Sequence, residues 1–180
     1  IRRAPCHRVT DLLAGQVDPL GRFSAVREKL LAFYPEDVRL KKLAVRAAVM
    51  AQAGQYNYPR CLKRGDMVAA QLARAEFMRA GMSMVYLLNH RYAPFYKWMH
   101  RGLEGMSVLP RAYEQFEQLA RELDGAQAAK QIEGICLTAA AELRRQGLSS
   151  ARDSFLLPHA AEIMEHIEDP ALRRTHVMEE

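Results

Sequence analysis

One segment, residues 66–90, constrains the fold of this chain more than any other. Its Met, Leu, Val and Phe residues cover most of the circumference when projected at 100° per residue. Such a pattern predicts a central helix that is packed on several sides, and Asp66 is expected to cap its first turn. The polar residues recur at spacings of three and four, which places them on one line along this helix: Glu76, Arg79, Ser83, Tyr86 and His90.

Apolar stripes at helical spacing also run through the flanking segments, whereas Val, Ile and Thr are too scattered to indicate strands. The sequence therefore predicts an all-α fold, a single bundle of about six to seven helices around the central hydrophobic helix. The bundle is expected to span residues 22–180, with 1–21 as an irregular lead-in from an upstream domain. A helix is expected to stop at Gly54, with a loop over 55–60. Apolar stripes are expected on four further helices: one contains Val26 and Leu30, one Leu123, one the residues from Ile132 to Leu143, and one Leu157.

Composition narrows the classes of function. No apolar stretch approaches the roughly 20 residues of a membrane span, so no membrane association is expected. The net charge of +5 favours an anionic partner such as a nucleotide. Three cysteines without a CxxC pair indicate reduced thiols and a cytoplasmic location. His159, Glu162 and His166 share a helix face, but an exposed face is the preferred interpretation, and no metal site is predicted.

Three segments carry a resemblance to a known family: YPEDVRLKK at 34–42, GQYNYPR at 54–60 and LLNHRYAPFYKW at 87–98. Over roughly residues 20–178 the chain resembles an uncharacterised family of bacterial and archaeal helical domains that follow a minimal nucleotidyltransferase-like domain. The resemblance implies a bundle similar to the C-terminal half of kanamycin nucleotidyltransferase. It also implies that the catalytic aspartates, the nucleoside triphosphate and Mg²⁺ belong to the upstream domain. This chain has no Gly-Ser followed by Asp-x-Asp, and no cofactor of its own is expected.

Aromatic and basic residues supply the candidate binding site. Aromatic faces can stack on a base, and cations can hold phosphate. The candidates are Tyr56, Arg60, Arg91, Tyr92, Tyr96, Lys97 and Trp98. In the alternative interpretation, Phe95 and Trp98 belong to the core and the cations are solvated. Arg39, Lys42 and Arg46 share a further basic face, on the helix that begins near Pro35.

Glu76 is the one candidate catalytic residue, as a general base for an incoming hydroxyl or amine. A structural salt bridge with Arg79 is the favoured alternative. Together these features predict the substrate-side domain of a nucleotidyltransferase-like protein, docked on its upstream catalytic domain. The competing hypothesis is a non-catalytic interaction or dimerisation module, with a homodimer as one possible assembly and the aromatic run as its hot spot.

Overall fold

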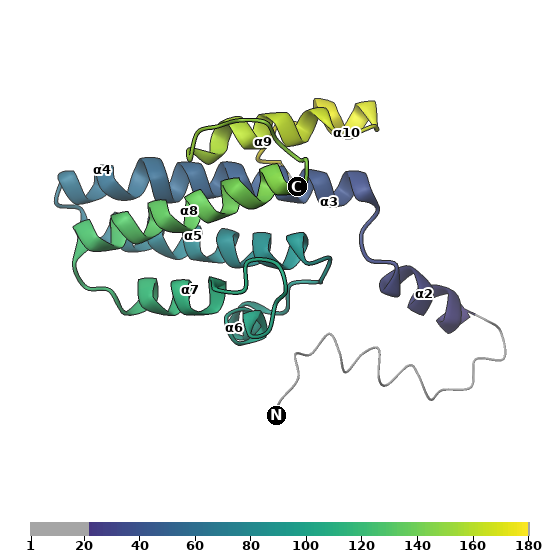
Figure 1. Cartoon of the computed structure of the whole chain (residues 1–180), viewed down its shortest axis with the longest axis horizontal. Coiled ribbons are helices and arrows are strands. Elements are labelled where there is room, and N and C mark those ends of the chain that lie inside the picture. The colour runs from purple at the N-terminus through teal and green to yellow at the C-terminus, as the bar shows by residue number, and fades with distance from the viewer. Residues whose placement is uncertain (1–21, 180) are drawn as a thin grey trace.

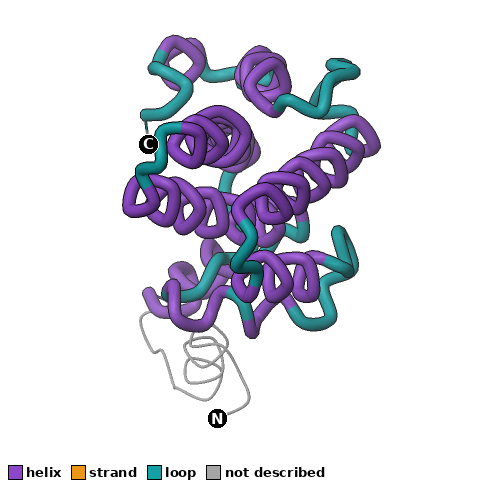
Figure 2. The backbone as a smooth tube through the Cα atoms, turned by 90° about the vertical axis from the view of Figure 1, so that its left-hand side faces the viewer, coloured by secondary structure: helices purple, strands orange, loops and turns teal. Residues whose placement is uncertain are grey.

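The computed structural model describes residues 22–179 as helices and loops, without a strand in that range. The all-α prediction is confirmed. Figure 1 gives the arrangement, and Figure 2 shows the helices joined by loops after a 90° turn. The elements are α2 (Arg22–Leu31), α3 (Glu36–Met50), the π-helix η1 (Ala51–Asn57), α4 (Tyr58–Lys63), α5 (Met67–Leu88), α6 (Tyr96–Met99), the 3₁₀-helix η2 (Arg101–Leu103), α7 (Ala112–Arg121), α8 (Gly125–Arg145), α9 (Leu156–Glu165) and α10 (Pro170–Arg174). The expectation for residues 1–21 lies outside the described residues.

Helices α3 and α5 share the centre of the bundle. Helix α3 packs on α5 on one side and on α9 on the other, while α5 also contacts α4, η1 and α7. Asp66 caps α5 as predicted, because its carboxylate accepts the N–H of Ala69 at 3.0 Å. The second half of α5 is buried nearly all round, but Met67, Val68 and Leu72 in its first half are exposed. The central-helix prediction therefore holds for the second half, and α3 is as central as α5.

The predicted stop at Gly54 and the loop over 55–60 are wrong. The chain stays helical from Glu36 to Lys63 through the π-helix η1. Gly54 is buried where α5 and α8 converge, and a Cβ atom there would lie 2.3 Å from Cδ2 of Phe77 and 2.9 Å from Cγ2 of Ile132. Pro59 lies in the first turn of α4, directly after the π-helix η1, and the helical path continues through it. Gly54 thus marks a close approach of helices rather than a helix end.

The stripe predicted on α8 is confirmed, since Ile132, Ile135, Cys136, Ala139 and Leu143 are all buried. Burial raises the pKa of the Cys136 thiol well above its usual range. The Cys136 side chain therefore packs as a small apolar group.

Four other expected core residues lie at the surface. Leu123 is 96% exposed because α7 ends at Arg121, before the stripe reaches it. Leu157 is exposed because the buried face of α9 begins at Leu156. Val26 is exposed because α2 stands apart from the bundle in Figure 1, and the same holds for Leu30.

None of the described helices is both long enough and apolar enough to cross a membrane.

Candidate functional site

An open groove of about 600 Å³ runs between α3, α5 and the segment that enters α6. Three walls can be distinguished: α3 contributes two valines and Arg46, α5 contributes a polar wall, and residues 93–96 form an aromatic rim. The lining residues are Val45, Arg46, Val49, Glu76, Arg79, Ala80, Ser83, Ala93, Pro94, Phe95, Tyr96, Met99 and Met178.

The polar wall comes from the line of residues predicted on α5. Glu76 accepts from Arg79, with 2.7 Å between Oε1 and the guanidinium nitrogen. Ser83 accepts from Nε of Arg46 on α3 at 2.9 Å. The favoured interpretation of Glu76 as a salt-bridge partner is therefore confirmed, and the ion pair lies on the groove wall. Because the pair is solvent-exposed, its stabilising contribution is small, and a ligand can compete for either partner.

Tyr86, also on this line, lies behind the groove and positions its rim. Its hydroxyl donates to the carbonyl of Met99 at 2.8 Å in the buried interior. Gly102 lies so close to that hydroxyl that a Cβ atom would approach it to 2.1 Å. This contact ties α6 and η2 to α5. The rim therefore rests on a packed support rather than on a free loop.

Two exposed aromatic rings form the rim. Phe95 is 62% and Tyr96 68% exposed, and their ring centroids are 4.5 Å apart. Phe95 is thus not a core residue, contrary to the alternative interpretation. Pro94 and Met99 are buried on either side of the pair. Large exposed apolar rings beside a groove are typical of ligand or partner binding.

The other candidates in the aromatic-basic run do not line the groove. Tyr92 packs against Phe33 and Tyr34, with ring centroids 4.9 and 4.8 Å away. Lys97 is exposed and lies over the half-buried Trp98 ring, 5.5 Å from its centroid. Arg91 is exposed outside the groove lining. Only Tyr96 among these predicted residues borders the groove.

Tyr56 and Arg60 form a separate pair on η1 and α4. The Arg60 guanidinium donates to the Tyr56 hydroxyl at 2.7 Å, and neither residue lines the groove. Arg46 and Met178 line the groove, although neither was predicted as a site residue. The basic face that contains Arg46 could have identified this residue from the sequence. No sequence pattern distinguishes Met178.

The predicted exposed face of α9 is corrected in part. His159 is fully buried, and its Nε2 lies 2.8 Å from the carbonyl oxygen of Asp153. Glu162 accepts from the loop before α9, and hydrogen bonds from Ser150 and Ser149 hold the pKa of its carboxyl below the usual range. Within residues 22–179, no three His, Cys, Asp or Glu side chains converge as a metal site would require.

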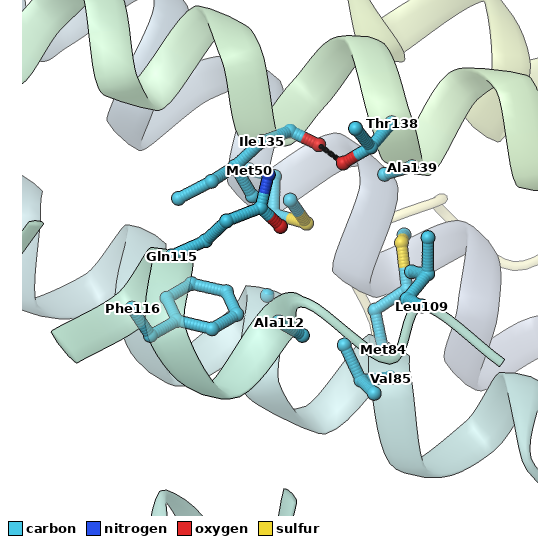
Figure 3. A pocket seen from close by; sticks show the side chains of 11 residues that line it. Met50, Met84, Val85, Leu109, Ala112, Gln115, Phe116, Ile135, Thr138 and Ala139 are labelled. Atoms are coloured by element: carbon cyan, nitrogen blue, oxygen red, sulfur yellow. Dashed lines mark hydrogen bonds between the residues drawn. The ribbon is translucent and has the colours of Figure 1, made fainter. Parts of the chain in front are cut away.

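A second, smaller pocket lies inside the bundle and has a volume of about 10 Å³. Figure 3 shows its mostly apolar lining, with Gln115 directed towards Met50 and the Thr138 hydroxyl bonded to the Ile135 carbonyl. This volume holds at most one water molecule. The groove is therefore the better candidate for a site.

Comparison with known proteins gives one match. Residues 2–99, slightly more than half of the chain, match the family described as a domain of unknown function, DUF4037. All three segments that carried the family resemblance fall within this range. No curated protein and no solved structure matches the chain.

Proposed function

The chain belongs to the DUF4037 family, a domain of unknown function, and on that premise we propose that it is the substrate-side helical domain of a nucleotidyltransferase-like protein. In this proposal the upstream domain holds the nucleoside triphosphate and Mg²⁺. The present domain docks on it in the cytoplasm and turns the groove towards the cleft. Nucleotide and acceptor then lie between the two.

The observation that carries the proposal is the chemistry assembled in the groove. Arg46 and Arg79 offer guanidinium groups suited to phosphate oxygens. Phe95 and Tyr96 offer exposed faces on which a base or another planar group can stack. A carboxylate, two guanidinium groups and two aromatic rings in one groove suit a ligand that is both anionic and planar.

Glu76 is the group for proton transfer within this proposal. The acceptor's own hydrogen bonds would compete with Arg79 for its carboxylate. A carboxylate that is freed from the ion pair can accept a proton from a hydroxyl or amine. Arg79 would then be available to the phosphate, so that one rearrangement serves both partners.

A thermal-shift screen of the full-length protein with ATP, GTP, CTP and UTP, each with Mg²⁺ or Mn²⁺, tests this function. A ligand at 100 times its dissociation constant stabilises by about 2.7 kcal/mol, which corresponds to several degrees in Tm. Arg46→Gln and Tyr96→Ala should reduce the shift. Arg91→Ala and Lys97→Ala, which remove exposed cations outside the groove, are the matched controls and should retain it.

Absence of stabilisation by all four nucleotides would contradict the transferase proposal.

The second candidate, an interaction or dimerisation module, is favoured by the exposure of Phe95 and Tyr96. In that case the protein should sediment as an oligomer that Tyr96→Ala dissociates. Trp98→Ala should have the smaller effect, because the Trp98 ring is half-buried and lies outside the groove.

A further inference from the structure

The segment that follows α10 contributes one residue, Met178, to the groove. We propose that residues 176–179 form a strap that covers one end of the groove and must move aside before a ligand can fill it. This inference rests on the proposed function, because it concerns access to the same groove. The strap would make ligand binding dependent on a conformational step within this chain.

Two residues of α3, one helical turn apart, guide the chain into this position. The Asp37 carboxylate accepts the N–H groups of Glu168 and Asp169 at 3.0 and 2.8 Å. Further along α3, Nζ of Lys41 donates to the carbonyl of His176 at 2.6 Å. The segment therefore returns to α3 next to Val45, where the groove begins.

Lys41 is an unusual anchor because it is only 4% exposed. Burial lowers its pKa, and the nearby Glu179 opposes that shift. A buried ammonium group is costly unless its protons find acceptors, and the His176 carbonyl is the oxygen acceptor that it has here. The strap consequently has a specific attachment point, and its release leaves Lys41 with an incomplete set of hydrogen bonds.

The contacts beyond this anchor are few. Val177 is partly buried against the core, whereas Met178 remains 36% exposed at the groove. The turn itself is closed by the Glu179 N–H, which donates to the His176 carbonyl at 2.9 Å. Met is a flexible, adaptable side chain that fills irregular gaps. Segments with few buried contacts open at a small fraction of the global unfolding free energy.

The strap should therefore act as an internal competitor. While Met178 occupies its place, a ligand meets a shortened groove. The apparent affinity of a ligand that needs the whole groove falls in proportion to the fraction of molecules in which the strap is open. Changes that release the strap should strengthen binding without altering any residue of α5 or of the aromatic rim.

Titration with the anionic aromatic dye 1-anilinonaphthalene-8-sulfonate tests the strap. Met178→Ser should remove its apolar hold, and Lys41→Met should remove its anchor while keeping an apolar chain of similar length. In both variants we expect the dye to bind roughly fivefold more tightly as the open fraction rises. Adding Tyr96→Ala to either variant should abolish this increase in dye affinity. Met67→Ser, which changes an exposed Met elsewhere, should behave as wild type.

Unchanged dye affinity in both Met178→Ser and Lys41→Met, with helical circular dichroism retained, would overturn the strap. If Lys41→Met loses its helical signal, the result of Met178→Ser alone decides. The dye measurement needs no nucleotide, so the two proposals can fail separately. Tighter dye binding without any nucleotide-induced shift would support the strap and contradict the transferase function.

Discussion

Replacing Gly54 with alanine is expected to lower the free energy of unfolding by about 3 kcal/mol. The added Cβ would lie 2.3 Å from Cδ2 and 2.8 Å from Cε2 of Phe77, and 2.9 Å from Cγ2 of Ile132. Phe77 and Ile132 are buried in α5 and α8, so neither side chain can swing into solvent. Relief would require the helices to move apart, and packed cores resist such movement.

Urea unfolding of Gly54→Ala and of wild type measures this effect. Phe77→Leu shortens the opposing side chain, so the double variant should be more stable than the sum of the single changes implies. Gly134→Ala is the matched control, because Gly134 is an exposed helical glycine with open space at its Cβ. That substitution should stabilise the protein by about 0.5–1 kcal/mol. Equal stabilities of Gly54→Ala and wild type would contradict the close helix approach.

Replacing Gly102 with alanine is expected to destabilise the protein by about 2 kcal/mol and to disturb the groove as well. Its Cβ would lie 2.1 Å from the Tyr86 hydroxyl oxygen. That oxygen is buried and bonded to the Met99 carbonyl, so it cannot yield without losing a hydrogen bond. The expected response is displacement of α6, which carries Tyr96 and Met99 at the groove.

The rescue variant for this prediction is Tyr86→Phe, which removes the clashing oxygen. In Gly102→Ala it should restore most of the lost stability, although alone it should cost about 1 kcal/mol. Denaturant unfolding gives the stabilities, and the nucleotide-induced thermal shift reports on the rim. If Gly102→Ala keeps both wild-type stability and the full shift, Tyr86 does not position the rim as proposed.

Long and regular elements were predictable from the sequence. The stripe on α8 and the Asp66 cap on α5 rest on local periodicity and local hydrogen bonding, which residues near in sequence determine. Gly54 shows the limit of this reasoning, because glycine serves both at helix ends and at close helix contacts. Which role applies depends on the contacts of Gly54 with Phe77 and Ile132. Both residues lie far from Gly54 in the sequence, so these contacts cannot be predicted from local sequence patterns.

The predicted ends of the apolar stripes were wrong for a related reason. An apolar residue such as Leu157 or Val26 can satisfy the helical spacing and still face solvent. Periodicity identifies the apolar face of a helix, but it does not show whether another element packs against every residue of that face. Leu156 is the buried residue at the start of α9, one position away from the predicted one. Such one-residue shifts are decided by the packing of α9 on α3.

The site could be predicted only in pieces. The polar line on α5 and the aromatic run were each visible, and the functional hypothesis assigned Glu76 and Tyr96 to one cleft, but their spacing in the sequence could not show that Glu76, Arg79 and Tyr96 border the same groove. Arg46 joins them from α3, and Met178 joins from the far end of the chain. Tyr56 and Arg60 have the right chemistry but lie elsewhere. Proximity between distant segments is a property of the packing, which composition and spacing do not encode.

Hydrogen–deuterium exchange of the full-length protein, with and without a nucleoside triphosphate and Mg²⁺, tests the groove most directly. The proposal predicts nucleotide-dependent protection in residues 76–83 and 93–99. It predicts no change in residues 125–145, which form α8 and do not line the groove. Protection confined to other parts of the protein, with unchanged exchange in 76–83 and 93–99 at saturating nucleotide, would contradict it.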